Sequence, residues 1–133
     1  KRFGLSDDDI EDMEPLPENQ RYIDFLMEVA EGGKIPEIWM AVLPCMLSYS
    51  YIFRKIEKIP GTSGSKYYDF IQDYAEDMYF ENCKSWCCFA EQKCRDLEAE
   101  EQERLGRIFE RASMLELDFW RMAYRESREE TDI

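Results

Sequence analysis

The chain has 133 residues, a net charge of −13 and no histidine. A chain of this length buries roughly two-thirds of its unfolded surface, which is enough for one domain. The acidic balance argues against nucleic acid and against an anionic membrane as partners, because both are bound by clustered Lys and Arg side chains. The lack of histidine excludes Cys–His and Ser–His catalytic pairs and any histidine-ligated metal site.

Cysteine usage indicates a reducing compartment. The chain has five cysteines: Cys45, Cys83, Cys87, Cys88 and Cys94. Their number is odd and four of them are crowded into one stretch, whereas a secreted scaffold has an even number spread along the chain. We therefore expect a cytoplasmic protein. We expect no signal peptide, because the first four residues lead directly into an acidic run. The uncharged stretch at 38–53 is too short and too well flanked by charges to predict a membrane span.

The first segment, residues 1–18, is predicted to be an acidic lead-in closed by Pro15 and Pro17. It is followed by a helix at about 19–30, where apolar residues recur at three- and four-residue spacing until Gly32 and Gly33 end the pattern.

A second helix is predicted from Pro36 to about Lys58. It is apolar nearly all round, so it should be the central, buried helix. Pro44 lies in its interior and should kink it just before Cys45.

The loop at 60–65 separates this helix from a third, predicted at about 66–95 with a break near 77–82. A fourth helix is predicted at about 98–125. No segment shows strand alternation, so the predicted fold class is all-α. Residues 19–127 form the expected helical domain and 128–133 a polar tail.

Three side chains suggest chemistry. Glu116 occupies a stripe of the fourth helix that otherwise holds apolar residues. A carboxylate there is costly unless it is paired, and such carboxylates serve as general acids or bases. Cys45 and Tyr49 share the corresponding stripe of the second helix.

Structural explanations compete with this interpretation. A single buried cysteine is usually a small core residue, and a tyrosine on such a stripe is usually half-buried core. Glu116 could instead be paired with Arg111 or Arg121. The chemical interpretation requires all these residues to meet in one cavity.

Four segments, in order and at matching spacings, resemble the TenA/thiaminase II family. They are Tyr22-Ile-Asp-Phe-Leu, Leu43-Pro44-Cys45 with Tyr49, Tyr68-Asp-Phe-Ile-Gln-Asp-Tyr74 and Ser113-Met-Leu-Glu116-Leu-Asp-Phe119-Trp120. The resemblance covers residues 4–125. It implies a helical bundle of the haem-oxygenase-like type, assembled as an oligomer, that hydrolyses thiamin-related aminopyrimidines without a cofactor or metal.

The resemblance also implies a role for each matching residue. Cys45 corresponds to the family's nucleophile and Glu116 to its acid/base group. The residues expected around the pyrimidine are Tyr22, Tyr49, Tyr74 and Phe119. An activated, accessible Cys45 should then be alkylated far faster than the other cysteines, whereas an inert Cys45 would favour a packing role.

The resemblance covers only the C-terminal part of the family's longer chains, so the N-terminal helices of the bundle are missing from the match. We therefore expect a homo-oligomer, or a second chain that supplies those helices, because an open bundle exposes an apolar flank. The alternative function is an inactive, truncated homologue that binds a pyrimidine or acts as a helical interaction module.

The cysteines of the third helix allow a further alternative, a metal or redox site at Cys83, Cys87, Cys88 and Cys94. Their spacing is not a standard zinc pattern and no histidine assists. We interpret them as part of an ordinary apolar helix face.

Overall fold

The computed structural model describes residue 6 and residues 13–129, and these contain helices and no strand. The elements are α2 (Pro17–Gly32), α3 (Ile35–Ile56), the short 3-10 helix η1 (Thr62–Gly64), α4 (Tyr68–Ala75), α5 (Asp77–Cys94) and α6 (Ala99–Glu129). The all-α prediction is confirmed. Most of the lead-in expected at 1–18 lies outside the described residues, and α6 continues into the segment expected as a polar tail.

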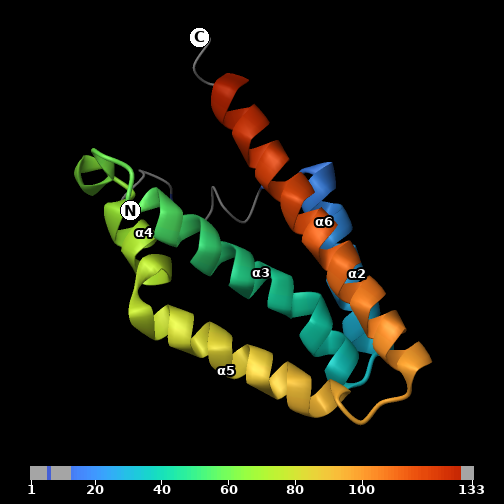
Figure 1. Ribbon diagram of the computed structural model, residues 1–133. Coiled ribbons are helices and arrows are strands. Elements are labelled where there is room, and N and C mark those ends of the chain that lie inside the picture. Colours follow the sequence, from blue (N-terminus) through green and yellow to red (C-terminus); the bar gives the residue numbers. More distant parts are fainter. Residues whose placement is uncertain (1–5, 7–12, 130–133) are drawn as a thin grey trace.

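The helix α3 is central, as predicted: it packs against α2, α4, α5 and α6. In Figure 1, α5 runs antiparallel to α3 on one side, and α6 begins near the N-terminal end of α3 and runs beside it with α2 behind. Pro44 lies inside α3, and the helix continues through it. This arrangement leaves α3 with neighbours on both sides, so its residues can contribute to more than one cavity.

By length and composition alone, α3 passes the test for a helix that could cross a membrane, but a single helix of this kind is weak evidence for a span. The core helix of a globular protein passes the same test, and α3 packs against every other α-helix in the described part of the chain. Its apolar character is therefore explained by its central place in the fold.

Two apolar clusters hold the helices together. One joins α2, α3 and α6 through the buried residues Tyr22, Phe25, Ala41 and Ala112. The other joins α3 to α4 through Phe53, Ile71 and Ala75, with Tyr49, Tyr74 and Trp120 packed against it. Burial of this apolar surface is the main contribution to stability. The two clusters contact α3 at different points along its length.

The turn from α2 to α3 depends on a close backbone approach at Gly33. A Cβ atom at this position would lie 2.4 Å from the carbonyl oxygen of Val29. Glu37 then closes the first turn of α3, because its carboxylate accepts a hydrogen bond from the backbone N–H of Lys34. The sequence prediction of a helix end at the two glycines is confirmed.

The predicted break in the third helix occurs at Glu76, one residue before the expected segment. Glu76 has an extended conformation and separates α4 from α5. Arg54 of α3 spans the break, because its guanidinium donates to the carbonyl oxygen of Ala75 at 3.1 Å and to Asp77 at 3.0 Å. A tertiary contact thus satisfies backbone groups that the break leaves unpaired.

Candidate active site

One face of α3 borders a cavity of about 540 Å³. The cavity collects side chains from α2, α3, α4 and α5, and its lining consists of Tyr22, Leu26, Val42, Cys45, Met46, Tyr49, Tyr74, Tyr79 and Trp86. A volume of this size accommodates a small heterocycle. Four tyrosines and one thiol therefore surround a space suited to an aromatic ligand.

Three of the predicted site residues meet beside this cavity. The Glu116 carboxylate of α6 accepts hydrogen bonds from the Tyr22 hydroxyl of α2 and from the Cys45 thiol of α3. Glu116 is only 5% exposed and Tyr22 only 8%. Three helices distant in sequence thus place an acid, a phenol and a thiol in one contact network.

The alternative pairing of Glu116 with an arginine is not found. Arg111 lies 3.9 Å from Glu28, and Arg121 lies 3.5 Å from Asp118 on its own helix. Among the described residues, no Lys or Arg forms an ion pair with Glu116. A carboxylate that is buried without a cation and bonded to a thiol is suited to exchange a proton with that thiol.

Burial first, and then the negative charge and hydrogen bond of Glu116, raise the pKa of Cys45 to about 12. The pKa of Tyr22 is raised by burial first and then by Glu116. Both groups are therefore neutral at physiological pH. We therefore expect slow alkylation of Cys45 in the resting protein, because reactivity follows the thiolate fraction and that fraction is very small here.

The aromatic wall extends along α3 and across the break between α4 and α5. The rings of Tyr49 and Tyr74 meet edge to face with centroids 4.9 Å apart, and those of Tyr74 and Tyr79 are 5.1 Å apart. The Tyr79 hydroxyl donates to the carbonyl oxygen of Met46 at 3.4 Å. Burial raises the pKa of Tyr49 and of Tyr79 to about 12, so both phenols remain protonated.

The sequence pattern did not predict that Tyr79 and Trp86 line the cavity. On a continuous helix Tyr79 would be rotated by about 140° from Tyr74 and would point elsewhere. The break at Glu76 redirects the chain, so that both rings face the same cavity. Trp86 lies on α5, on the apolar face that also holds Cys83. The centroid of its ring lies 4.4 Å from that of the Trp39 ring.

Phe119 is not among the residues that line this cavity. Its ring packs edge to face against Trp120 at 6.1 Å, and Trp120 in turn lies 5.4 Å from the ring of Tyr49. Phe119 therefore supports the aromatic wall through a neighbour. Of the predicted substrate-contacting residues, the structure brings Tyr22, Tyr49 and Tyr74 together at the cavity.

The cysteines of α5 do not gather into a site. Cys83 is buried against α3, where its thiol lies 3.6 Å from the Met46 carbonyl oxygen, whereas Cys87 and Cys88 are exposed. Within residues 6 and 13–129, no group of three or more Cys, Asp or Glu side chains is placed to hold a metal ion.

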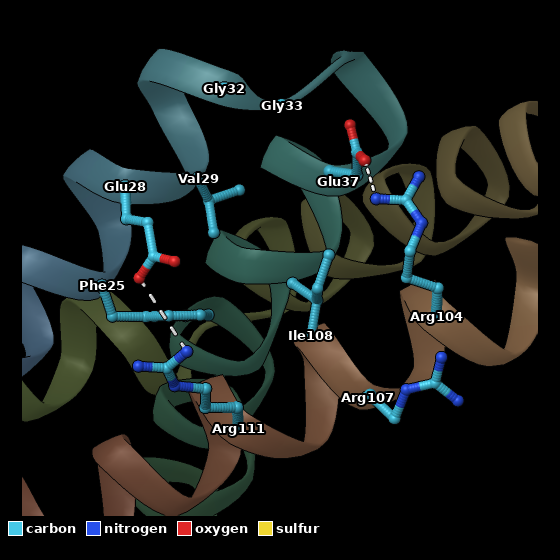
Figure 2. A pocket seen from close by; sticks show the side chains of 10 residues that line it. All are labelled: Phe25, Glu28, Val29, Gly32, Gly33, Glu37, Arg104, Arg107, Ile108 and Arg111. Atoms are coloured by element: carbon cyan, nitrogen blue, oxygen red, sulfur yellow. Dashed lines mark hydrogen bonds and ion pairs between the residues drawn. The ribbon is translucent and has the colours of Figure 1, made fainter.

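A second concavity of about 340 Å³ lies between α2, the start of α3 and α6 (Figure 2). Arg104 forms an ion pair with Glu37, and Arg111 lies over the ring of Phe25 at 4.8 Å while facing Glu28. This surface holds no thiol or hydroxyl, and its charges are largely paired with one another. Its contacts join the three helices, whereas Cys45 and Tyr22 line the other cavity and contact Glu116 beside it.

Comparisons with known proteins show the family to which this chain is similar. The model of the family described as TENA/THI-4/PQQC matches residues 1–126. An aminopyrimidine aminohydrolase of Halalkalibacterium halodurans is 35% identical over 127 residues, which are 95% of this chain and 57% of the relative. An aminopyrimidine aminohydrolase of Helicobacter pylori is 27% identical over 93% of this chain and 58% of its own length.

Among solved structures, a TenA homologue protein from P. horikoshii OT3 superposes with a TM-score of 0.77 at 29% identity. The match covers 92% of this chain and 56% of that protein. The fold is therefore the helical haem-oxygenase-like fold of those proteins. The chain spans little more than half the length of the relatives it matches.

Proposed function

The chain belongs to the TENA/THI-4/PQQC family, and on that premise we propose that it hydrolyses a thiamin-related aminopyrimidine. The proposed reaction converts an aminomethylpyrimidine to the hydroxymethylpyrimidine and releases ammonia. The observation that carries the proposal is the contact of Glu116 with both Cys45 and Tyr22 at the edge of a tyrosine-lined cavity.

The chemistry follows from the protonation states. Because Cys45 is a neutral thiol, Glu116 must first take its proton, so that the thiolate forms only in contact with the base. The thiolate adds to the electron-poor pyrimidine ring and a C–S bond forms. The displaced electrons break the C–N bond at the exocyclic methylene, and the amine leaves with the proton held by Glu116.

A water molecule completes the cycle. It adds to the methylene carbon, Glu116 takes a proton from it, and a C–O bond forms. The electrons then return through the ring and the C–S bond breaks, which regenerates the Cys45 thiolate; Glu116 returns the proton to it. The tyrosine rings are suited to hold the heterocycle, since aromatic faces and edges pack against one another favourably.

We also propose that the active assembly contains a second chain, either another copy or a chain that carries the rest of the helical bundle. Apolar side chains remain exposed on three helices: Ile23 and Met27 on α2, Ile35 and Tyr51 on α3, and Met114, Leu117 and Tyr124 on α6. Surfaces of this kind mark interfaces. Sedimentation as an ideal monomer, with turnover intact, would contradict this part of the proposal.

We place the protein in the cytoplasm. All five cysteines are free, as expected in a reducing compartment. Titration of the unfolded protein, taken from its native cells under alkylating conditions, should therefore find five blocked thiols. Disulfide-linked peptides would argue for an oxidising compartment.

The test of the function is ammonia release from 4-amino-5-aminomethyl-2-methylpyrimidine by the chain and by its Cys45→Ser variant. Cys87→Ser is the matched control, because it makes the same substitution at an exposed cysteine outside the cavity. We expect turnover in the wild type and the control and none in Cys45→Ser. A fully active Cys45→Ser variant would exclude the nucleophile role. Well-folded wild type without turnover would favour the alternative, a pyrimidine-binding or helical interaction module.

A further inference from the structure

Glu116 lines another cavity, which lies on the face of α3 opposite to the tyrosine-lined cavity. This cavity has a volume of about 320 Å³ and is lined by Pro44, Leu47, Ser48, Tyr51, Phe109, Ser113 and Glu116. The carboxylate therefore has two sides. One contacts Cys45 and Tyr22, and the other faces the hydroxyl of Ser48.

The Ser48 hydroxyl has two acceptors for its one hydrogen. Its oxygen lies 3.0 Å from the backbone carbonyl oxygen of Cys45 and 3.5 Å from Oε2 of Glu116. A hydroxyl donates only one hydrogen at a time and can rotate between such acceptors. An ionised carboxylate is the stronger acceptor of the two, whereas a protonated one is not.

We propose that Ser48 is a positioning residue for Glu116 in the proposed hydrolysis, and the inference rests on that function. The hydroxyl donates to Glu116 while the carboxylate is ionised and holds it against Cys45. When Glu116 takes the thiol proton, the hydroxyl turns to the Cys45 carbonyl oxygen. Ser48 thus favours the ionised state of Glu116, from which it removes a proton from the Cys45 thiol and then from water.

Few groups near Glu116 are placed to stabilise its negative charge. The titratable side chains that interact with it are Tyr22 of α2 and Cys45 and Tyr49 of α3. None of these is a cation. Hydrogen-bond donors are therefore the means by which the described part of the protein stabilises a charge at this position.

Ser113 provides a matched control. It lines the same cavity and lies one turn before Glu116 on α6, but its hydroxyl donates to the carbonyl oxygen of Phe109 at 2.8 Å within its own helix. Removing this hydroxyl should leave Glu116 unaffected. Ser48→Thr is the conservative variant, because threonine keeps the hydroxyl.

The experiment measures kcat and KM for wild type, Ser48→Ala, Ser48→Thr and Ser113→Ala. For Ser48→Ala we expect kcat to fall by about tenfold, the effect of one hydrogen bond to a charged group, with KM nearly unchanged. Ser48→Thr should restore the wild-type kcat, and Ser113→Ala should match the wild type. A kcat for Ser48→Ala equal to that of Ser113→Ala would overturn the inference.

A second readout separates this inference from the proposed function. The rate of Cys45 alkylation at a fixed pH should rise in Ser48→Ala and stay unchanged in Ser113→Ala, because Ser48 holds the Glu116 carboxylate, whose charge suppresses the thiolate, against Cys45. This change is expected whether or not the chain turns over an aminopyrimidine. Absence of turnover with a changed alkylation rate would refute the proposed function alone, and an unchanged rate in Ser48→Ala would refute the role of Ser48.

Discussion

The thiol of Cys45 on α3 donates a hydrogen bond to the carboxylate of Glu116 on α6, where Glu116 is buried and Cys45 is half-buried. In the proposed hydrolysis, this contact would let a cysteine be both unreactive at rest and a nucleophile during turnover. The acceptor that suppresses the thiolate by its charge is also the base that can remove the proton. Activation therefore requires a substrate that receives the thiolate as it forms.

Glu116→Gln should change thiol reactivity and turnover in opposite directions. The amide removes the negative charge that raises the pKa of Cys45, so alkylation of Cys45 at pH 8–9 should accelerate by about tenfold for each unit by which that pKa falls. Turnover should fall by about 10²–10⁴-fold because the general acid/base is lost. Mass spectrometry of peptides alkylated with iodoacetamide measures the first quantity and ammonia release the second. A parallel loss of both would contradict the proposed relationship.

In the wild type, Cys45 should react with iodoacetamide at pH 7.5 much more slowly than Cys87 and Cys88. Its pKa is raised to about 12 by burial and by Glu116, whereas the other two side chains are exposed. The time course of labelling at each cysteine, resolved by peptide mapping, provides the measurement. Preferential labelling of Cys45 would show that its thiolate is stabilised by a group that this account does not include.

Tyr79→Ala should weaken substrate binding more than it slows the chemical step. The ring forms part of the cavity wall against Tyr74, and its hydroxyl anchors α5 to the Met46 carbonyl oxygen. We expect KM to rise by about tenfold, since an aromatic contact contributes roughly 1 kcal/mol beyond buried area. Tyr79→Phe keeps the ring and should retain most of the affinity. An unchanged KM in Tyr79→Ala would exclude this ring from the substrate site.

Phe25→Ala should lower the free energy of unfolding by about 3–5 kcal/mol, because it leaves a cavity in the cluster that joins α2, α3 and α6. Phe25 is 3% exposed, whereas Met27 on the same helix is 54% exposed. Met27→Ala is therefore the control and should change stability by less than about 0.5 kcal/mol. Urea unfolding followed by circular dichroism measures both. Equal effects would mean that α2 is not packed as described.

Glu37→Gln should destabilise the protein at neutral pH but much less in acid. The Lys34 backbone N–H, and then Arg104, lower the pKa of Glu37 in the folded state. A lowered folded pKa gives stability that is present above the ordinary carboxyl pKa of about 4.3 and is lost as pH falls through the folded value.

The difference in urea midpoint between wild type and Glu37→Gln should therefore shrink below about pH 4. Glu28→Gln is the control, because Glu28 is exposed and its partner Arg111 lies 3.9 Å away. It should behave like wild type at either pH. A Glu37→Gln difference that is independent of pH would indicate a packing effect instead of a charge effect.

Much of the fold could be predicted from local pattern. The helix end at Gly32 and Gly33, the central place of α3 and the all-α class follow from periodicity, helix-terminating residues and composition. The sequence predicts the break between α4 and α5 one residue too far along the chain, because Glu76 is neither a proline nor a glycine and does not itself indicate a helix end. Arg54, distant in sequence, stabilises that break from α3.

The sequence by itself determined which groups are available: a thiol and a tyrosine on one apolar stripe, a carboxylate on another, and no histidine to assist them. The contacts of Glu116 with Cys45 and Tyr22 could be seen only in the tertiary structure. The same is true of Tyr79, which lines the cavity, and of Phe119, which packs against Trp120 and does not line it. Helical periodicity specifies which residues share a face, but a hydrogen bond or a pKa shift depends on the separation between faces of different helices. That separation is set by how the side chains of α2, α3 and α6 pack together.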